Sequence, residues 1–292
     1  MSLLTRLETF DRRWVFVAMA FAVVLPLVFP LGLPTEPSPP VKAIYYTIED
    51  LAPGSTVLVS VDVDPASTPE LEPYYRATIR HLKKRGHKLV FLTLWYQAPP
   101  LVERWIRETV ERPTFPGDRA YRKNVDYAWL GFREGKVATI ANLGQDMWAT
   151  FAGRTADGTP FSAIPLLAPF RRLADFPLIV LVSSGAPGAK EYVQQVQTRY
   201  GLRIVAACTA VSTTDLAPYY QAGQLLGLAG GMSATAEYEI MVAELVGTDP
   251  RDGLGAKALD VLNIGHLVII AAILFGNTIY FLGRRRDRRG AA

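Results

Sequence analysis

Two long apolar segments, one near each end of the chain, constrain this sequence more than any other feature. Residues 14–33 contain no charged side chain over 20 positions, and residues 264–282 contain none over 19. As helices, both are long enough to cross the ~30 Å hydrocarbon core of a bilayer. The mean hydropathy of +0.15 is correspondingly high. We therefore expect a membrane protein with two transmembrane helices, with a cleaved signal peptide as the alternative for the first segment.

Charge is distributed unevenly around these segments. Eight of the 31 Lys and Arg residues and three of the 27 Asp and Glu residues lie outside them, in the first 13 and last ten residues. The 23 basic and 24 acidic residues between the segments nearly cancel. Because Lys and Arg next to a transmembrane helix favour the cytoplasmic side, both termini are expected in the cytoplasm. Residues 35–262 are then expected outside the cytoplasmic membrane.

Apolar and amphipathic runs alternate between the two segments. Residues 56–63 and 88–95 predict buried strands, with an amphipathic helix between them at 69–85. This spacing indicates right-handed crossover units on a parallel sheet. We predict an α/β domain with a three-layer, Rossmann-like, mostly parallel sheet. The remaining strands are expected at 127–132, 137–142, 178–183 and 203–208, and the remaining helices at 99–112, 144–151, 189–200, 216–222 and 234–246.

These expectations divide the chain into seven parts. Four prolines between residues 34 and 40 indicate a stiff, extended spacer after the first membrane segment. The parts are a cytoplasmic N-terminus (1–13), transmembrane helix 1 (14–33), a Pro-rich linker and entry to the domain (34–55), the extracytoplasmic α/β domain (56–254), a linker helix (255–263), transmembrane helix 2 (264–282) and a basic cytoplasmic tail (283–292).

Both membrane segments contain residues that suit a neighbouring helix. Pro26 and Pro30 interrupt the backbone hydrogen bonds of the first segment. Asn277 and Thr278 lie in the second, where a polar group facing lipid is costly. The alternative is that Asn277 lies at the lipid headgroups. The expected partners are the lipid bilayer and other integral membrane subunits, and a homo-oligomer is left open.

Three parts of the central domain carry a resemblance to a known family. They are residues 124–127 with 130–132, residues 208–212, and residues 224–231 with Glu237 and Tyr238. These stretches resemble an uncharacterised family of bacterial membrane proteins in which two transmembrane helices flank an extracytoplasmic α/β domain. The resemblance covers most of the domain. It implies a bacterial inner membrane with the domain in the periplasm, and it implies no activity.

Two carboxylates follow the first expected strand. Asp62 and Asp64 lie at its carboxyl end, where ligands of open parallel sheets bind. The pair resembles the first motif of haloacid-dehalogenase-type phosphatases, with Thr93 as the second, and this implies Mg²⁺ and phosphoryl transfer. The sequence departs from that family because Pro65 follows directly and the later strand ends without an acidic pair. The alternative is a turn in which both carboxylates accept backbone N–H groups.

A loop of small residues follows the strand expected at 178–183. Ser183, Ser184 and Gly185 precede an expected helix, so their hydroxyl and backbone N–H groups could bind an anion there. Ser212 follows the neighbouring strand and could join the same crevice. The alternative is that these residues form only tight turns and helix caps.

Other chemistries are excluded or disfavoured by residue content. Cys208 is the only cysteine, which excludes a disulfide scaffold and, with only three histidines, a His or Cys metal cage. We expect Cys208 to be buried. His81 and His87 accompany a basic run at the end of a helix and are expected to face solvent. This run lacks interleaved aromatic residues, so we expect no nucleic-acid partner.

Three functions fit these observations. The first is a non-enzymatic accessory or scaffold subunit of a larger bacterial membrane complex. The second is a tethered binding or sensor domain for a small anionic ligand at the carboxyl ends of the strands. The third is a divergent metal-dependent phosphohydrolase, and only this one requires a cofactor, Mg²⁺. An exposed apolar patch on the domain would favour the first, a deep polar crevice the second, and a divalent ion between Asp62 and Asp64 the third.

Overall fold

The computed structural model describes residues 11, 13–33 and 35–290. The chain forms two compact units. The α/β domain comprises residues 34–256, and the helical unit comprises residues 1–33 together with 257–292. The expected cytoplasmic N-terminus lies mostly outside the described residues, as do the last two residues of the expected basic tail.

The α/β domain is built on six parallel strands in the order β3-β2-β1-β4-β5-β6. This finding confirms the α/β fold class, and the order is that of doubly wound dinucleotide-binding sheets. Because the chain order reverses between β1 and β4, the carboxyl ends of these strands flank the topological switch point. The strands are β1 (Thr56–Asp62), β2 (Lys88–Thr93), β3 (Tyr127–Phe132), β4 (Ile179–Ser183), β5 (Ile204–Cys208) and β6 (Gly227–Gly230).

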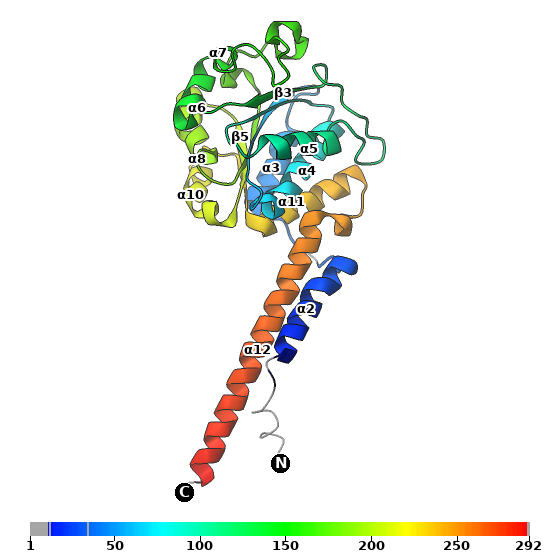
Figure 1. The fold of residues 1–292 in the computed structure, drawn as a ribbon, viewed down its shortest axis with the longest axis vertical. Coiled ribbons are helices and arrows are strands. Elements are labelled where there is room, and N and C mark those ends of the chain that lie inside the picture. Colours follow the sequence, from blue (N-terminus) through cyan, green and yellow to red (C-terminus); the bar gives the residue numbers. More distant parts are fainter. Residues whose placement is uncertain (1–10, 12, 34, 291–292) are drawn as a thin grey trace. The chain divides into compact units, whose positions relative to one another are not determined.

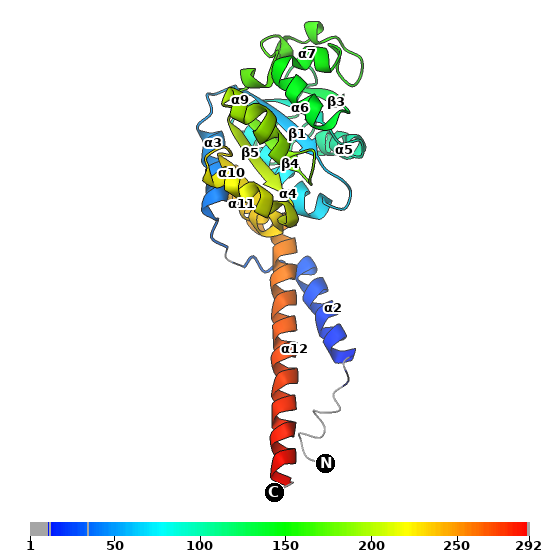
Figure 2. The same cartoon turned by 90° about the vertical axis from the view of Figure 1, so that its left-hand side faces the viewer.

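Helices cover both faces of the sheet (Figures 1 and 2). Alternate residues of β1 enter opposite apolar cores, since Val57 and Val59 belong to one and Leu58 to the other. The first core is closed by α3 (Pro39–Glu49), α4 (Thr68–Lys84), α5 (Pro99–Thr109) and α11 (Gly231–Val246). The second is closed by α6 (Lys136–Gln145), α7 (Met147–Thr150), α8 (Ala189–Tyr192) with the π-helical turn Val193–Gln197, and α10 (Ala210–Gln221), while the short α9 (Thr198–Tyr200) buries no side chain.

The strand expected at 137–142 is wrong, because these residues belong to α6. Ile140 and Leu143 are fully buried and Met147 continues the same face, a spacing of three and four residues that is helical. Val137, which starts the same run, is 40% exposed. The loop that follows α7 contains three short 3-10 turns, Phe161–Ala163, Pro165–Leu167 and Leu173–Asp175, and a further one is Pro250–Asp252.

The extended spacer expected before the domain is also wrong in its second half. Pro39 and Pro40 occupy the first turn of α3, where a helix needs no N–H donor. Ile44 of α3 packs against β6, a strand that the sequence analysis missed. A Cβ at Gly227 would lie 2.6 Å from the backbone nitrogen of Ile44. Gly227, which makes the strand hard to detect in the sequence, therefore lets α3 approach it closely.

The helical unit contains one helix long and apolar enough to cross a membrane among the described residues. It lies in α12 (Leu254–Gly290), over the stretch Leu254–Arg284. Only 11% of an apolar segment of 18 residues within this stretch is buried. The expected linker helix 255–263 is the start of this same helix. The first apolar segment is helical only over α2 (Arg13–Val28), and 16 residues span about 24 Å. A full-length first membrane helix at 14–33 is therefore not supported, since Pro30 disfavours helix at the residue before it.

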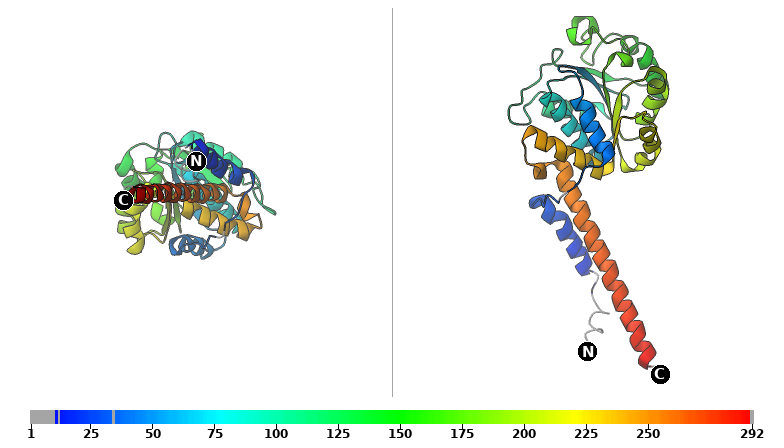
Figure 3. Two further views of the ribbon diagram at one scale, coloured as in Figure 1. Left: turned by 90° about the horizontal axis from the view of Figure 1, so that it is seen from below. Right: turned by 180° about the vertical axis from the view of Figure 1, so that it is seen from behind.

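Asp260 joins the end of the first apolar segment to α12. Its carboxylate is 2% exposed and accepts the backbone N–H groups of Leu31, Gly32 and Leu33 at 2.8, 3.0 and 3.3 Å. Gly32 has a φ of +62°, which lets successive N–H groups converge on one carboxylate. Figure 3 shows α2 beside α12 in two further views.

The four expected contact residues of the membrane segments differ in their surroundings. Pro26 is buried inside α2, and Pro30 is half-buried just beyond it. Thr278 donates a hydrogen bond to the carbonyl of Leu274 in its own helix, at 2.8 Å, so its hydroxyl needs no second helix. Asn277 is exposed.

Candidate functional site

The residues singled out after the strands gather at the carboxyl edge of the sheet, by the switch point between β1 and β4. Asp62 pairs with Ser183 in the register of these strands, and Ser183 pairs with Cys208 of β5. The N–H of Ser184 donates to the carbonyl of Asp62 at 2.9 Å. The parallel sheet therefore brings Asp62, Ser183 and Ser184 together, as their positions at strand ends predict.

Asp62 is part of the buried framework of this edge. Its side chain is 1% exposed and accepts the N–H of Leu94 at 2.6 Å, the hydroxyl of Ser60 at 2.7 Å and that of Thr93 at 3.3 Å. Burial raises the pKa of Asp62 to about 6, while these hydrogen bonds oppose the rise. The carboxylate ties the end of β2 to β1, and no side of it faces solvent.

Asp64 forms the turn between β1 and α4. Its carboxylate accepts the N–H of Ser67 at 2.8 Å, and the Ser67 hydroxyl donates to the Asp64 carbonyl at 3.0 Å. The hydroxyls of Ser67 and Ser184 are hydrogen-bonded to each other. Asp62 and Asp64 thus receive donors from different directions. Among the residues that the structure describes, no group of three or more His, Cys, Asp or Glu is placed to hold a metal ion.

The serine loop is held by its own hydrogen bonds. Ser183 Oγ donates to the carbonyl of Gly185 at 3.1 Å and accepts the N–H of Ala189 at 3.3 Å. Ser212 Oγ donates to the carbonyl of Ser184 at 3.4 Å. The hydroxyls expected to bind a ligand are therefore engaged with the backbone of the loop and of the following helix.

Protein carboxylates occupy the helix starts of this edge, where an anion would bind. Glu191 accepts the N–H of Gly188 at the start of α8, at 2.8 Å. Glu70 accepts the N–H of Ala210 at the start of α10, at 2.9 Å. Asp64 does the same for Ser67 before α4. The loop between β1 and α4 also contains Pro65 and lacks glycine, so it has no dinucleotide-binding fingerprint.

The loop between β4 and α8 separates two cavities at this edge. The smaller, of about 80 Å³, includes Ser183, Gly185 and Ser212 in its lining. Lys190 Nζ and Asp215 also line it and form an ion pair at 3.7 Å. Its volume is well below the ~300 Å³ at which small-molecule sites begin.

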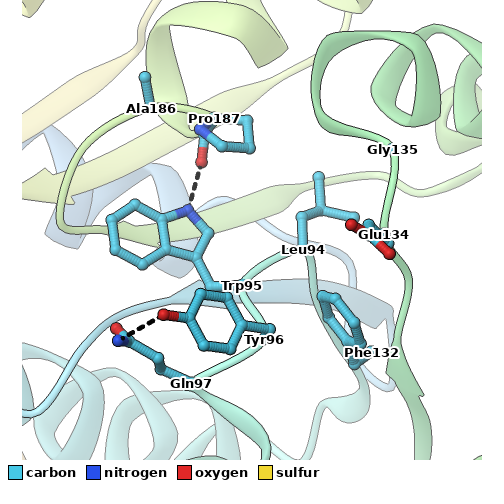
Figure 4. Close-up of a pocket in the computed structure, with 9 residues that line it drawn as sticks. All are labelled: Leu94, Trp95, Tyr96, Gln97, Phe132, Glu134, Gly135, Ala186 and Pro187. Carbon is cyan, nitrogen blue, oxygen red and sulfur yellow. Dashed lines mark hydrogen bonds between the residues drawn. The ribbon is translucent and has the colours of Figure 1, made fainter.

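The larger cavity, of about 330 Å³, lies beyond β2 and β3 (Figure 4). We call it the aromatic pocket. Trp95 Nε1 donates to the carbonyl of Pro187 at 2.7 Å, which fixes the indole against the β4–α8 loop. Gln97 Nε2 donates to the hydroxyl of Tyr96 at 2.9 Å, and Tyr96 is 75% exposed. The pocket is lined by Leu94, Trp95, Tyr96, Gln97, Phe132, Glu134, Gly135, Ala186 and Pro187.

This pocket was not among the sites expected from the sequence. Its residues come from three separated segments that follow β2, β3 and β4. The signal that could have found it is an aromatic residue at or just beyond two strand ends, namely Trp95 with Tyr96 and Phe132. The sites expected from the sequence consist of polar residues, which indicate chemistry more directly.

The histidines in the basic run at the end of α4 do not lie where the sequence indicates. His81 and His87 are buried, at 0% and 1% exposed, and do not face solvent. His81 contacts the hydroxyl of Tyr238 through Nδ1 at 2.9 Å and Glu49 through Nε2 at 2.7 Å. Burial lowers the pKa of His81 to about 4, although Glu49 opposes this shift. These partners lie on α3 and α11, far away in sequence.

Lys83, in the same run, caps the C-terminus of α5. It is 6% exposed, and its Nζ donates to the carbonyls of Thr109 and Arg112, both at 3.0 Å, and to Asp118 at 2.8 Å. A buried cation is therefore neutralised by one carboxylate and by the negative end of a helix. Cys208 is fully buried, and burial raises the pKa of its thiol to about 11.

Comparisons with known proteins leave the site to be interpreted from its geometry. No family model, no curated protein and no solved structure matches the chain.

Proposed function

We propose that this chain is a membrane-anchored binding domain for a small molecule, which it holds in the aromatic pocket. The observation that carries the proposal is the position of this cavity of about 330 Å³ at the carboxyl edge, beside the switch point of a doubly wound sheet. Ligands of such sheets bind outside the carboxyl ends of the strands, around the switch point. The volume falls within the ~300–1,000 Å³ of small-molecule sites, and the lining combines apolar walls with a few polar groups.

The anchor in this proposal is α12, which crosses a bacterial inner membrane. The apolar side chains of α12 are exposed along its length, including Leu267, Ile273 and Leu274 at 59%, 57% and 63%. Such exposure is favourable in a lipid bilayer and costly in water. Arginines after α12 favour a cytoplasmic C-terminus, and the α/β domain then lies in the periplasm. Helix α2 would enter the membrane beside α12, held by Asp260.

The phosphohydrolase alternative is not favoured by the geometry. That chemistry needs a carboxylate that can reach a metal ion and a phosphoryl group. Asp62 is buried with donors on both oxygens, and one oxygen of Asp64 caps a turn.

The accessory-subunit function remains a prediction. Within the α/β domain, the large exposed apolar side chains lie on different elements, such as Tyr46 on α3, Tyr200 on α9 and Val211 on α10. Purification from the membrane tests this function. Extraction of the full chain from its native membrane in a mild detergent, followed by sizing and mass spectrometry, would show stoichiometric partners if it is a subunit.

The binding function is tested by ligand-induced stabilisation of the full chain in detergent. A library of small metabolites is screened for compounds that raise the melting temperature. We expect a compound that stabilises the wild type but not Tyr96→Ala, which removes one wall of the pocket. Tyr46→Ala is the matched control, because Tyr46 is similarly exposed, at 59%, but lies on α3. Equal stabilisation of all three proteins would contradict binding in the pocket.

A further inference from the structure

The charge of the aromatic pocket distinguishes between classes of ligand. Glu134 is the only one of the nine lining residues with a formal charge, and none of them is Lys, Arg or His. Glu134 is exposed and follows β3, on the far side of the pocket from the Trp95 indole (Figure 4). Among the described residues that line the pocket, a ligand therefore meets one negative group and no positive one.

The aromatic lining adds a second, independent preference. Trp95, Tyr96 and Phe132 make up three of the nine lining residues and come from two neighbouring strand ends. The face of each ring carries negative electrostatic potential and attracts a cation within about 6 Å. Sets of aromatic rings with a nearby carboxylate are how proteins recognise alkylammonium groups.

The loop after β4 adds a further negative group next to the pocket. At the start of α8, which follows Pro187, the Glu191 carboxylate accepts the N–H of Gly188 at 2.8 Å. An anionic ligand would have to displace this carboxylate or lie close to it.

We propose that the ligand of the aromatic pocket is a small organic cation of the alkylammonium class. This inference rests on the proposed function, since it names the ligand class of the same site. The ammonium group lies among the aromatic rings of Trp95 and Tyr96 and is attracted across the pocket by the Glu134 carboxylate. The rest of the molecule contacts Leu94 and Phe132, which supply apolar surface.

The experiment compares probes of equal shape and different charge. The full chain is purified in a maltoside detergent without phosphatidylcholine, whose headgroup is itself an alkylammonium. Choline and benzyltrimethylammonium are the cations, 3,3-dimethylbutan-1-ol is the neutral isostere of choline, and benzoate is the anion. Binding is followed by tryptophan emission at constant ionic strength, with Trp95→Phe identifying the part of the signal that comes from Trp95.

We expect a cation to bind at least tenfold more tightly than its neutral isostere. Tyr96→Ala should weaken cation binding about 3- to 30-fold, the range for one cation–π contact. Glu134→Gln should weaken the cation and leave the neutral probe unchanged. Glu244→Gln is the matched control, because Glu244 is an exposed glutamate on α11 outside the pocket.

The outcomes separate the ligand class from the binding function. If the neutral isostere or benzoate binds as tightly as the cations, with dependence on Tyr96, the cation proposal is wrong and the binding function stands. If none of the probes changes the Trp95 signal and the metabolite screen also finds no Tyr96-dependent compound, both proposals fail. Cation binding that is unchanged in Glu134→Gln and Tyr96→Ala places the cation elsewhere and also overturns the proposal.

Discussion

The carboxyl edge of the sheet and the C-terminal end of α4 hold charged side chains of opposite sign against helix ends. At the carboxyl edge, Glu191 and Glu70 meet backbone N–H groups at helix starts. At the end of α4, Lys83 meets backbone carbonyls at the end of α5. Each arrangement places a side chain against the complementary end of a helix dipole. A charged side chain near a strand or helix end can therefore be structural, even where ligands usually bind.

The two regions differ in what they leave open. The end of α4 is closed, with His81 and Lys83 at 0% and 6% exposure. The carboxyl edge holds its carboxylates in the framework and leaves the aromatic pocket beside them. We therefore propose that function lies in the cavity, and we interpret the polar residues named in both regions as contributing to stability.

The largest effect is expected for Lys83→Met. The substitution leaves the Asp118 carboxylate and the carbonyls at the end of α5 without their buried cation. Removal of one partner from a buried ion pair costs about 3–5 kcal/mol. The free energy of unfolding, measured by urea titration of the full chain in detergent, should fall by this amount.

The neighbouring Lys84→Met is the control, because Lys84 is exposed. A surface substitution of this kind changes the free energy of unfolding by less than about 0.5 kcal/mol. If both variants lost the same small amount, the end of α4 would be as open as the sequence first indicated.

Asp62→Asn should change how stability depends on pH. The pKa of Asp62 is raised in the folded state to about 6, from 3.8. Between these values the unfolded chain loses its proton first, so stability falls as pH rises from about 4 to 6 and is constant above that. This rise in the pKa corresponds to a change of about 3 kcal/mol in the free energy of unfolding. The free energy of unfolding of the variant relative to wild type should therefore rise by about this amount between pH 4 and pH 7.

The measurement is a set of urea titrations at several pH values. Curves of stability against pH that stay parallel for the two proteins would show that Asp62 ionises freely in the folded state. Such a result would restore Asp62 as an accessible carboxylate, and with it the phosphohydrolase alternative.

His81→Gln should give the opposite slope. The pKa of His81 is lowered in the folded state to about 4, from 6.5, because it is buried. The unfolded chain binds the proton first as pH falls, so this histidine makes stability rise from about pH 4 to 6.5. The contribution of His81 to the free energy of unfolding, which the variant lacks, is again of the order of 3 kcal/mol. Relative to wild type, the variant should lose stability as pH rises over this interval, and a rising difference would contradict the buried neutral histidine.

The sequence predicted those parts of the molecule whose causes are local. The strands β1, β2, β4 and β5 are continuous apolar runs, which indicate burial on both faces. The gathering of Asp62 and Ser183 followed from the geometry of any parallel sheet. The strand β6 was missed because it contains glycines, of which Gly227 allows a close contact with Ile44, about 180 residues earlier in the chain.

The parts that were not predicted depend on contacts between distant segments. Lys83 is buried because Asp118 and the end of α5 receive it, and a basic run in sequence does not reveal such a receptor. The aromatic pocket is assembled from residues that follow three strands. Its existence depends on where the loop after β4 lies, which is fixed in part by the contact from Trp95 to Pro187.

The smallest effect is expected at the start of α10, for Glu70→Ala. The substitution removes the carboxylate that accepts the N–H of Ala210. Loss of such a cap costs about 1 kcal/mol. It also frees a helix start to bind an anion, so sulfate should stabilise the variant more than the wild type. Equal stabilisation by sulfate, measured as the rise in melting temperature against a chloride control of the same ionic strength, would show that Glu70 does not take the place of an anion. The carboxyl edge would then be open to anionic ligands, and the division between framework and pocket would fail on that side.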